Sequence, residues 1–148
     1  MNESSKLQMN VEYLDCSDEV SVLRKPPSQR MCWLAAEITA QDWRVILPDA
    51  AALEIQGLAR LIEDNPLQML QRRVDDHDLP ALRELMTRMK SILDDGVGFA
   101  VLDRLPMDDF AIDTLIEVYW MLGQFIGRPV AQKWNGQMIY DVSDTGLY

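Results

Sequence analysis

Three segments of the sequence carry apolar residues at the three- and four-residue spacing of an amphipathic helix. We expect these helices over 49–64, 80–95 and about 108–126, with an acidic or proline residue in or before the first turn of each. Each segment is followed by a helix-ending residue, at Pro66, Gly96 and Gly127. The fold must therefore bury three helix faces, whatever strands accompany them.

Two short apolar runs rich in strand formers lie outside these helices. Residues 45–47 form a short strand candidate, and the length of the run at 97–102 predicts a buried strand. The first 30 residues are mixed in character and contain Pro26-Pro27, so we expect a poorly packed leader with at most one short strand, around 20–23.

The last segment has the pattern of a hairpin. Asn135-Gly136 suits a two-residue type I′ turn, whose central residues both need positive φ. We therefore predict antiparallel pairing of residues 130–134 with residues 137–142.

The predicted core joins the strand at 97–102 to the helix that follows it, because each offers an apolar face. The four tryptophans are also expected to pack inside rather than to stack on a ligand. The core is predicted to centre on Phe99, Val101, Leu115, Tyr119, Leu122 and Phe125.

Composition limits the partners. A chain of 148 residues, 48% hydrophobic and 26% charged, is one domain or a piece of a larger one. Its 24 acidic and 14 basic residues give a net charge of −10, which argues against a nucleic-acid partner. No apolar run reaches the roughly 18 residues of a membrane span, and the polar N-terminus resembles no secretory signal. We expect a cytoplasmic protein without a membrane partner.

Side chains for metal and nucleophile chemistry are few. His77 is the single histidine, and Cys16 and Cys32 are the two cysteines. Iron, zinc and copper sites usually take two or more imidazole or thiolate ligands. His77 lies among aspartates, so we predict a solvated loop residue, although a single ligand in an intersubunit site stays open. Cys32, beside Trp33, is predicted to pack as a small hydrophobe.

Other catalytic signatures are also weak. Gly96-Val97-Gly98 lacks the third glycine of a dinucleotide fingerprint and precedes a strand rather than following one. The paired aspartates are adjacent in sequence, so their side chains do not face each other as an acid–base dyad would. From the residues alone we predict an acidic α+β domain with no self-sufficient active site, and we assign no catalytic residue and no metal ligand in it.

Two motifs resemble a known family. Residues 94–106 read DDGVGFAVLDRLP, and residues 122–130 read LGQFIGRPV. They resemble the N-terminal part of enzymes of the taurine dioxygenase/TfdA-like family. The members of this family are Fe(II)- and 2-oxoglutarate-dependent oxygenases. In that family a G-x-G-F-x-V-L-x-x-L-P strand leads into a helix that ends L-G-x-x-x-G-x-P-V. The resemblance is good over about 90–142 and weaker over 32–66.

The resemblance implies a fold class. Residues 31–148 would be the N-terminal helices and first strands of a double-stranded β-helix (clavaminate synthase-like) oxygenase fold, incomplete in this chain, after a flexible leader at 1–30. The segment after the first hairpin lies near the substrate in related enzymes. Gln132, Tyr140 and Asp144 are therefore candidates for lining a small-molecule substrate site.

The sequence departs from the family at the metal ligands. The family binds iron through a His-x-Asp and a second, distant histidine, whereas here His77-Asp78-Leu79 does not fit and precedes the matching strand. No iron ligand can be assigned, so Fe(II) and 2-oxoglutarate are implied only for a complete enzyme that hydroxylates a small organic substrate. A missing C-terminal half or a second chain would supply the site.

Two hypotheses follow. The chain is a fragment or truncated member of such an oxygenase, inactive alone. Alternatively, it is a non-catalytic helper domain that pairs with another chain through an exposed sheet edge at 137–142.

Overall fold

The computed structural model describes residues 24, 26, 29–106, 108–140, 142 and 146. Of these, the residues from 24 to Gly127 belong to one compact unit, and those from Arg128 onward belong to another. Most of the expected leader, with its strand around 20–23, lies outside the described residues. The elements in chain order are η1 (Gln29–Met31), α2 (Ala40–Trp43), β1 (Arg44–Val45), α3 (Asp49–Asp64), η2 (Met69–Gln71), η3 (Val74–Asp76), α4 (Pro80–Asp95), β2 (Val101–Leu102) and α5 (Ile112–Ile126).

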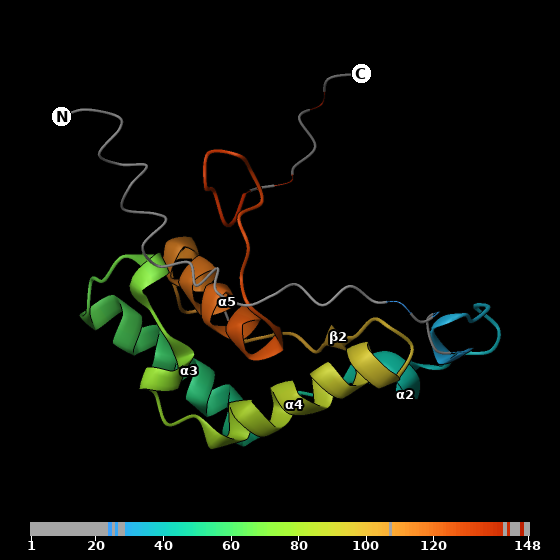
Figure 1. The fold of residues 1–148 in the computed structure, drawn as a ribbon. Coiled ribbons are helices and arrows are strands. Elements are labelled where there is room, and N and C mark those ends of the chain that lie inside the picture. Colours follow the sequence, from blue (N-terminus) through green and yellow to red (C-terminus); the bar gives the residue numbers. More distant parts are fainter. Residues whose placement is uncertain are drawn as a thin grey trace. The chain divides into compact units, whose positions relative to one another are not determined.

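The three predicted helices are confirmed as α3, α4 and α5, which pack against one another (Figure 1). The bounds of α3 and α4 agree with the sequence pattern. Helix α5 begins at Ile112, later than predicted, because Ala111 is its extended N-cap and Asp108 pairs with Arg104 instead of capping. Within the described part of the chain, every helix is too short or too polar to cross a bilayer.

The core lies among the three helices and β1. The largest fully buried side chains are Leu82, Met121, Val45 and Val118. The structure corrects the predicted core. Leu122 is buried as predicted, but Tyr119 is 65% exposed and Val101 is 48% exposed. Phe99, Leu115 and Phe125 are only half-buried.

The rotation of α5 explains these errors. Its sequence is apolar on nearly every side, so spacing alone does not indicate which face turns inward. The helix buries Thr114, Val118 and Met121. Each of them directly precedes a residue of the predicted face, which is Leu115, Tyr119 or Leu122.

The sheet is smaller than predicted. Strands β1 and β2 pair in parallel, with Arg44 opposite Val101 and Val45 opposite Leu102. The Asp103 amide donates to the Val45 carbonyl at 2.9 Å, and Arg44 Nε pairs with Asp103 Oδ1 at 2.8 Å. The 97–102 motif thus contributes two strand residues, and Figure 1 shows this pair near the C-terminal end of α4.

The charged segment at 71–78 is a loop formed around η2 and η3, and one of its charges is buried. Arg72 is 4% exposed, and its guanidinium pairs with Glu117 of α5. The same group donates to the carbonyl oxygens of Ile62, at 3.3 Å, and Asn65, at 2.6 Å. Arg72 therefore joins the end of α3 to α5.

The predicted hairpin is only partly present. Gly136 donates to the Lys133 carbonyl at 3.0 Å, so the turn is centred one residue earlier than predicted. Gly136 has φ 84°, but Asn135 does not take positive φ; its side chain accepts from the Gln137 amide at 3.1 Å. The type I′ prediction is therefore wrong.

No strand is found over 130–140. One bond, from the Gln132 amide to the Gln137 carbonyl at 2.8 Å, links the two sides of the turn. The sheet edge predicted at 137–142 does not form within the described part of that segment.

Candidate functional site

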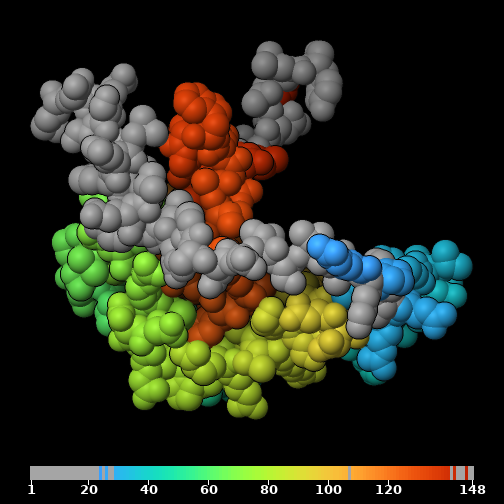
Figure 2. Space-filling view, viewed as in Figure 1, coloured from blue at the N-terminus to red at the C-terminus, as the bar shows by residue number. Residues whose placement is uncertain are grey.

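A pocket of about 470 Å³ opens where η1, α2 and the C-terminal end of α4 meet. These elements stand together at one end of the helical unit, where the blue and cyan residues border the yellow end of α4 (Figure 2). The lining residues come from three stretches of sequence. They are Gln29, Arg30, Cys32, Trp33, Glu37, Ile38, Asp42, Ser91, Ile92, Asp95, Gly96 and Val97.

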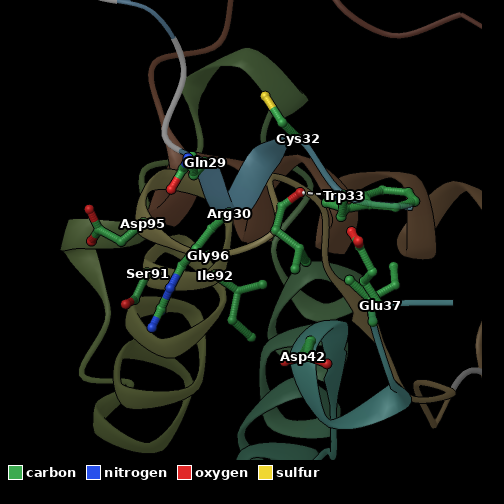
Figure 3. Close-up of a pocket in the computed structure, with 12 residues that line it drawn as sticks. Gln29, Arg30, Cys32, Trp33, Glu37, Asp42, Ser91, Ile92, Asp95 and Gly96 are labelled. Atoms are coloured by element: carbon green, nitrogen blue, oxygen red, sulfur yellow. Dashed lines mark hydrogen bonds between the residues drawn. The ribbon is translucent and has the colours of Figure 1, made fainter. Parts of the chain in front are cut away.

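An aromatic cluster supports one wall. The indole N–H of Trp33 donates to the Val97 carbonyl at 2.9 Å, the contact dashed in Figure 3. Phe99 lies between two tryptophans, with ring centroids 5.3 Å from Trp33 and 5.9 Å from Trp43. This cluster attaches the segment before α2 to the segment that carries the Gly-Phe motif.

The four tryptophans differ in burial. Trp120 is buried, with 8% exposure, as predicted. Trp33 and Trp43 belong to the aromatic cluster beside the pocket rather than to the core, and Trp134 is 96% exposed. The prediction that all four tryptophans lie in the core is therefore wrong.

Asp42 lies at the base of the pocket as drawn in Figure 3 and is held by Thr39. Its carboxylate accepts from the Thr39 amide at 2.7 Å and from the Thr39 hydroxyl at 2.9 Å. The backbone N–H of Thr39, followed by its hydroxyl, lowers the pKa of Asp42, because both donors favour the ionised form. Asp42 is thus a fixed negative charge at the start of α2.

The other polar groups come from loops. Figure 3 shows Arg30 extending along α4 toward Ser91 and Ile92, with Glu37 beneath Trp33. Glu37 accepts from the Leu34 amide at 2.9 Å. Cys32 is exposed rather than packed, which corrects the prediction; it follows the single turn of η1, in which no residue is buried.

The pocket combines an indole, one guanidinium and three carboxylates, and it offers no paired nucleophile and base. Such a set can bind a polar molecule but supplies no evident catalytic step. Nowhere among the described residues do three or more His, Cys, Asp or Glu side chains gather where they could hold a metal ion. The residues that the structure describes do not fit the iron centre that the family resemblance implies.

The residues predicted to line a substrate site lie elsewhere in the chain. Gln132 is exposed, and its side-chain amide donates to the Val130 carbonyl at 3.0 Å. Tyr140 is 44% exposed, with the Lys133 ammonium 4.8 Å from its ring centroid. Asp144 lies outside the described residues. Gln132 and Tyr140 belong to the unit that begins at Arg128, whereas the pocket belongs to the helical unit.

His77 follows η3 in a loop, as predicted, and is half-buried; its amide donates to the Val74 carbonyl at 3.2 Å. Arg30, Glu37 and Asp42 line the pocket but were not among the site residues predicted from the sequence. The spacing of Thr39 and Asp42 is typical of a helix N-terminus and could have located α2. No comparable residue spacing indicated Arg30 as a pocket residue.

No family model matches the chain. The chain is similar to FR-33289 synthase of Streptomyces rubellomurinus (strain ATCC 31215), with 26% identity over 130 residues. The match covers 86% of this chain but 38% of the synthase. The chain therefore spans well under half the length of this relative, and the relationship, to an enzyme named as a synthase, is distant.

Proposed function

We propose that this chain is the N-terminal portion of an Fe(II)- and 2-oxoglutarate-dependent oxygenase of the taurine dioxygenase/TfdA-like kind. The complete enzyme would hydroxylate a small organic substrate, and this portion holds neither the iron nor the co-substrate by itself. The proposal depends mainly on the coverage of the synthase match. The match covers 86% of this chain but only 38% of the synthase.

One further observation supports the proposal. The motif at 94–106 supplies β2, and α5 follows it and ends within the motif at 122–130, which is the order of strand and helix that the resemblance implies. In the complete enzyme, the role of this chain would be to supply helices that pack against a sheet and stabilise it.

The test is turnover of 2-oxoglutarate by the purified chain with Fe(II), alone and with a polypeptide that carries the His-x-Asp and the distant histidine. We expect no succinate from the chain alone and succinate from the completed pair. Iron-dependent succinate from the pure chain, abolished in His77→Ala, would overturn the proposal. The reading frame after the codon for Tyr148 is a second test: a stop without any His-x-Asp downstream would favour the helper-domain alternative.

A further inference from the structure

The pocket between η1, α2 and the end of α4 has an acidic lining. Its lining residues include three acids, Glu37, Asp42 and Asp95, and one base, Arg30, so the acids exceed the base by two charges. Charges of one sign around a hollow reinforce one another, because the protein wall screens them less than open water does. The pocket therefore attracts cations and repels anions.

Two of these carboxylates are held in place and keep an oxygen for a ligand. Both bonds from Thr39 reach Oδ2 of Asp42, and the bond from the Leu34 amide reaches Oε2 of Glu37. Among the described residues, no donor is bonded to the second oxygen of either carboxylate. The Thr39 bonds also lower the pKa of Asp42, so this carboxylate is ionised at neutral pH. A bound ammonium group would meet acceptors that are already oriented.

Arg30 is the counter-charge that the chain itself supplies to the pocket. Its guanidinium adds to the effect of the Thr39 bonds in lowering the pKa of Asp42, so the two charges are near each other. Arg30 forms no ion pair with any other described residue, and Figure 3 shows its exposed side chain extended along α4. An attraction between exposed charges is weak, so a cation from solution can displace Arg30.

A fixed aromatic side chain supplies the apolar part of the pocket. Trp33 is 36% exposed, its indole N–H is bonded to the Val97 carbonyl, and its ring packs against Phe99. The orientation of the indole is therefore set before a ligand arrives. Indole attracts a cation over its face more strongly than the other aromatic rings do. The side chains of Ile38 and Ile92 add apolar lining.

We propose that this pocket binds a small organic cation in which a primary ammonium group is joined to an apolar ring. Glu37 and Asp42 accept from the ammonium group, and the ring lies against Trp33. The volume of about 470 Å³ is within the range of small-molecule sites. This inference goes beyond the proposed function and does not depend on it, since it uses neither iron nor 2-oxoglutarate.

The test measures binding of para-fluorobenzylamine to the purified chain by fluorine NMR, at neutral pH and about 0.15 M sodium chloride. That salt concentration screens the general attraction between a cation and an acidic chain. The alcohol para-fluorobenzyl alcohol and the anion para-fluorobenzoate are probes of nearly the same shape without the positive charge. We expect saturable binding of the amine with a Kd of about 1 mM or tighter, and binding at least roughly tenfold weaker for the other two probes.

Two substitutions in the pocket should change the affinity for the amine in opposite directions. Asp42→Asn should weaken binding by roughly tenfold, because it removes the charge but keeps an oxygen that can accept from Thr39. Arg30→Gln should tighten binding by roughly threefold, because it removes the competing cation. Misfolding cannot produce a gain of affinity.

The matched controls make the same charge changes outside the pocket. Glu84→Gln and Arg88→Gln lie on the exposed side of α4 and are not lining residues. Each should leave the affinity for the amine within about twofold of the unsubstituted chain, because distant exposed charges are screened at this salt concentration.

Several results would overturn the inference: no saturable binding of the amine, equal affinities for the three probes, or equal losses in Asp42→Asn and Glu84→Gln. Weaker binding of the amine in Arg30→Gln would do so too. Tightest binding of the benzoate, lost in Arg30→Gln, would assign the pocket to an anion instead. Displacement of the amine by magnesium chloride, but not by sodium chloride of the same ionic strength, would assign it to a divalent metal ion.

Discussion

At the residue scale, Arg72 has the greatest structural consequence in the helical unit. Its side chain is 3% exposed and reaches Glu117 and two carbonyls at the end of α3. Its own carbonyl accepts from Trp120 Nε1 at 3.3 Å and from Gln124 Nε2 at 3.1 Å. One loop residue thus satisfies polar groups from α3 and α5.

We expect Arg72→Ala to lower the free energy of unfolding by about 3 kcal/mol, because Glu117 and the carbonyls lose a buried donor. Urea denaturation measures the change. Arg83→Ala is the control: its pair with Asp75 is exposed and 3.5 Å long, so its loss should cost under about 1 kcal/mol. Equal losses for the two variants would contradict the structural role of Arg72.

Asp42 gives a pH prediction at the same scale. The Thr39 amide and hydroxyl hold the pKa of Asp42 below its ordinary value of 3.8. A depressed carboxyl pKa stabilises the fold above that ordinary value, and the effect is lost as pH falls through the folded pKa. The midpoint of the pH-dependent shift of the Thr39 amide resonance should therefore lie below 3.8 in an NMR titration. Asp42→Asn should abolish that movement, and a midpoint above 3.8 would contradict the contact.

At the scale of elements, α4 begins with a cap that comes from another helix. Glu54 of α3 accepts from the Ala81 amide at 3.0 Å and from the Leu82 amide at 2.8 Å. Those amides have no partner inside the helix, and a carboxylate there also suits the helix dipole. The contact joins the N-terminal end of α4 to the side of α3.

Glu54→Ala should therefore lower the free energy of unfolding by about 1–2 kcal/mol, the range of a lost N-terminal cap. Chemical denaturation reports the change. Glu84→Ala, an exposed acid on α4 itself, is the matched control and should change stability by no more than about 0.5 kcal/mol. If the two substitutions have the same effect, the cap does not stabilise α4.

The rotation of α5 can be tested with two neighbouring sites. Met121→Ala should cost about 2–5 kcal/mol, because Met121 is fully buried and its loss leaves a cavity. Tyr119→Ala should cost under about 1 kcal/mol in the isolated chain, because that ring is 65% exposed. Thermal or urea unfolding of both variants suffices, and the reverse order would restore the core predicted from the sequence.

At the scale of the whole molecule, the dominant property is a net charge of −10. Like charges on one chain repel, and salt at roughly 0.15 M shortens the screening length to about 8 Å. The urea midpoint should therefore rise when sodium chloride is added from low ionic strength to roughly that level. A midpoint that falls would mean that exposed ion pairs outweigh the general repulsion.

The local features followed from single residues. Pro66 follows the end of α3, because proline has no amide donor to continue the helix. Gly96 and Gly127 are the C-cap residues of α4 and α5, both with negative φ. The count of one histidine likewise shows that this chain cannot supply both imidazoles of a site built from two histidines and a carboxylate.

Which surfaces meet depends on packing between segments that are distant in the sequence. Helix α5 is apolar on both sides, so its orientation depends on what α3 and α4 offer, and the spacing of its residues leaves that open. Arg72 sits among charges in a loop, and its burial depends on Glu117, 45 residues away in the chain. Hydrophobic burial and charge pairing act between distant segments, so the core, the buried arginine and the orientation of α5 follow from packing.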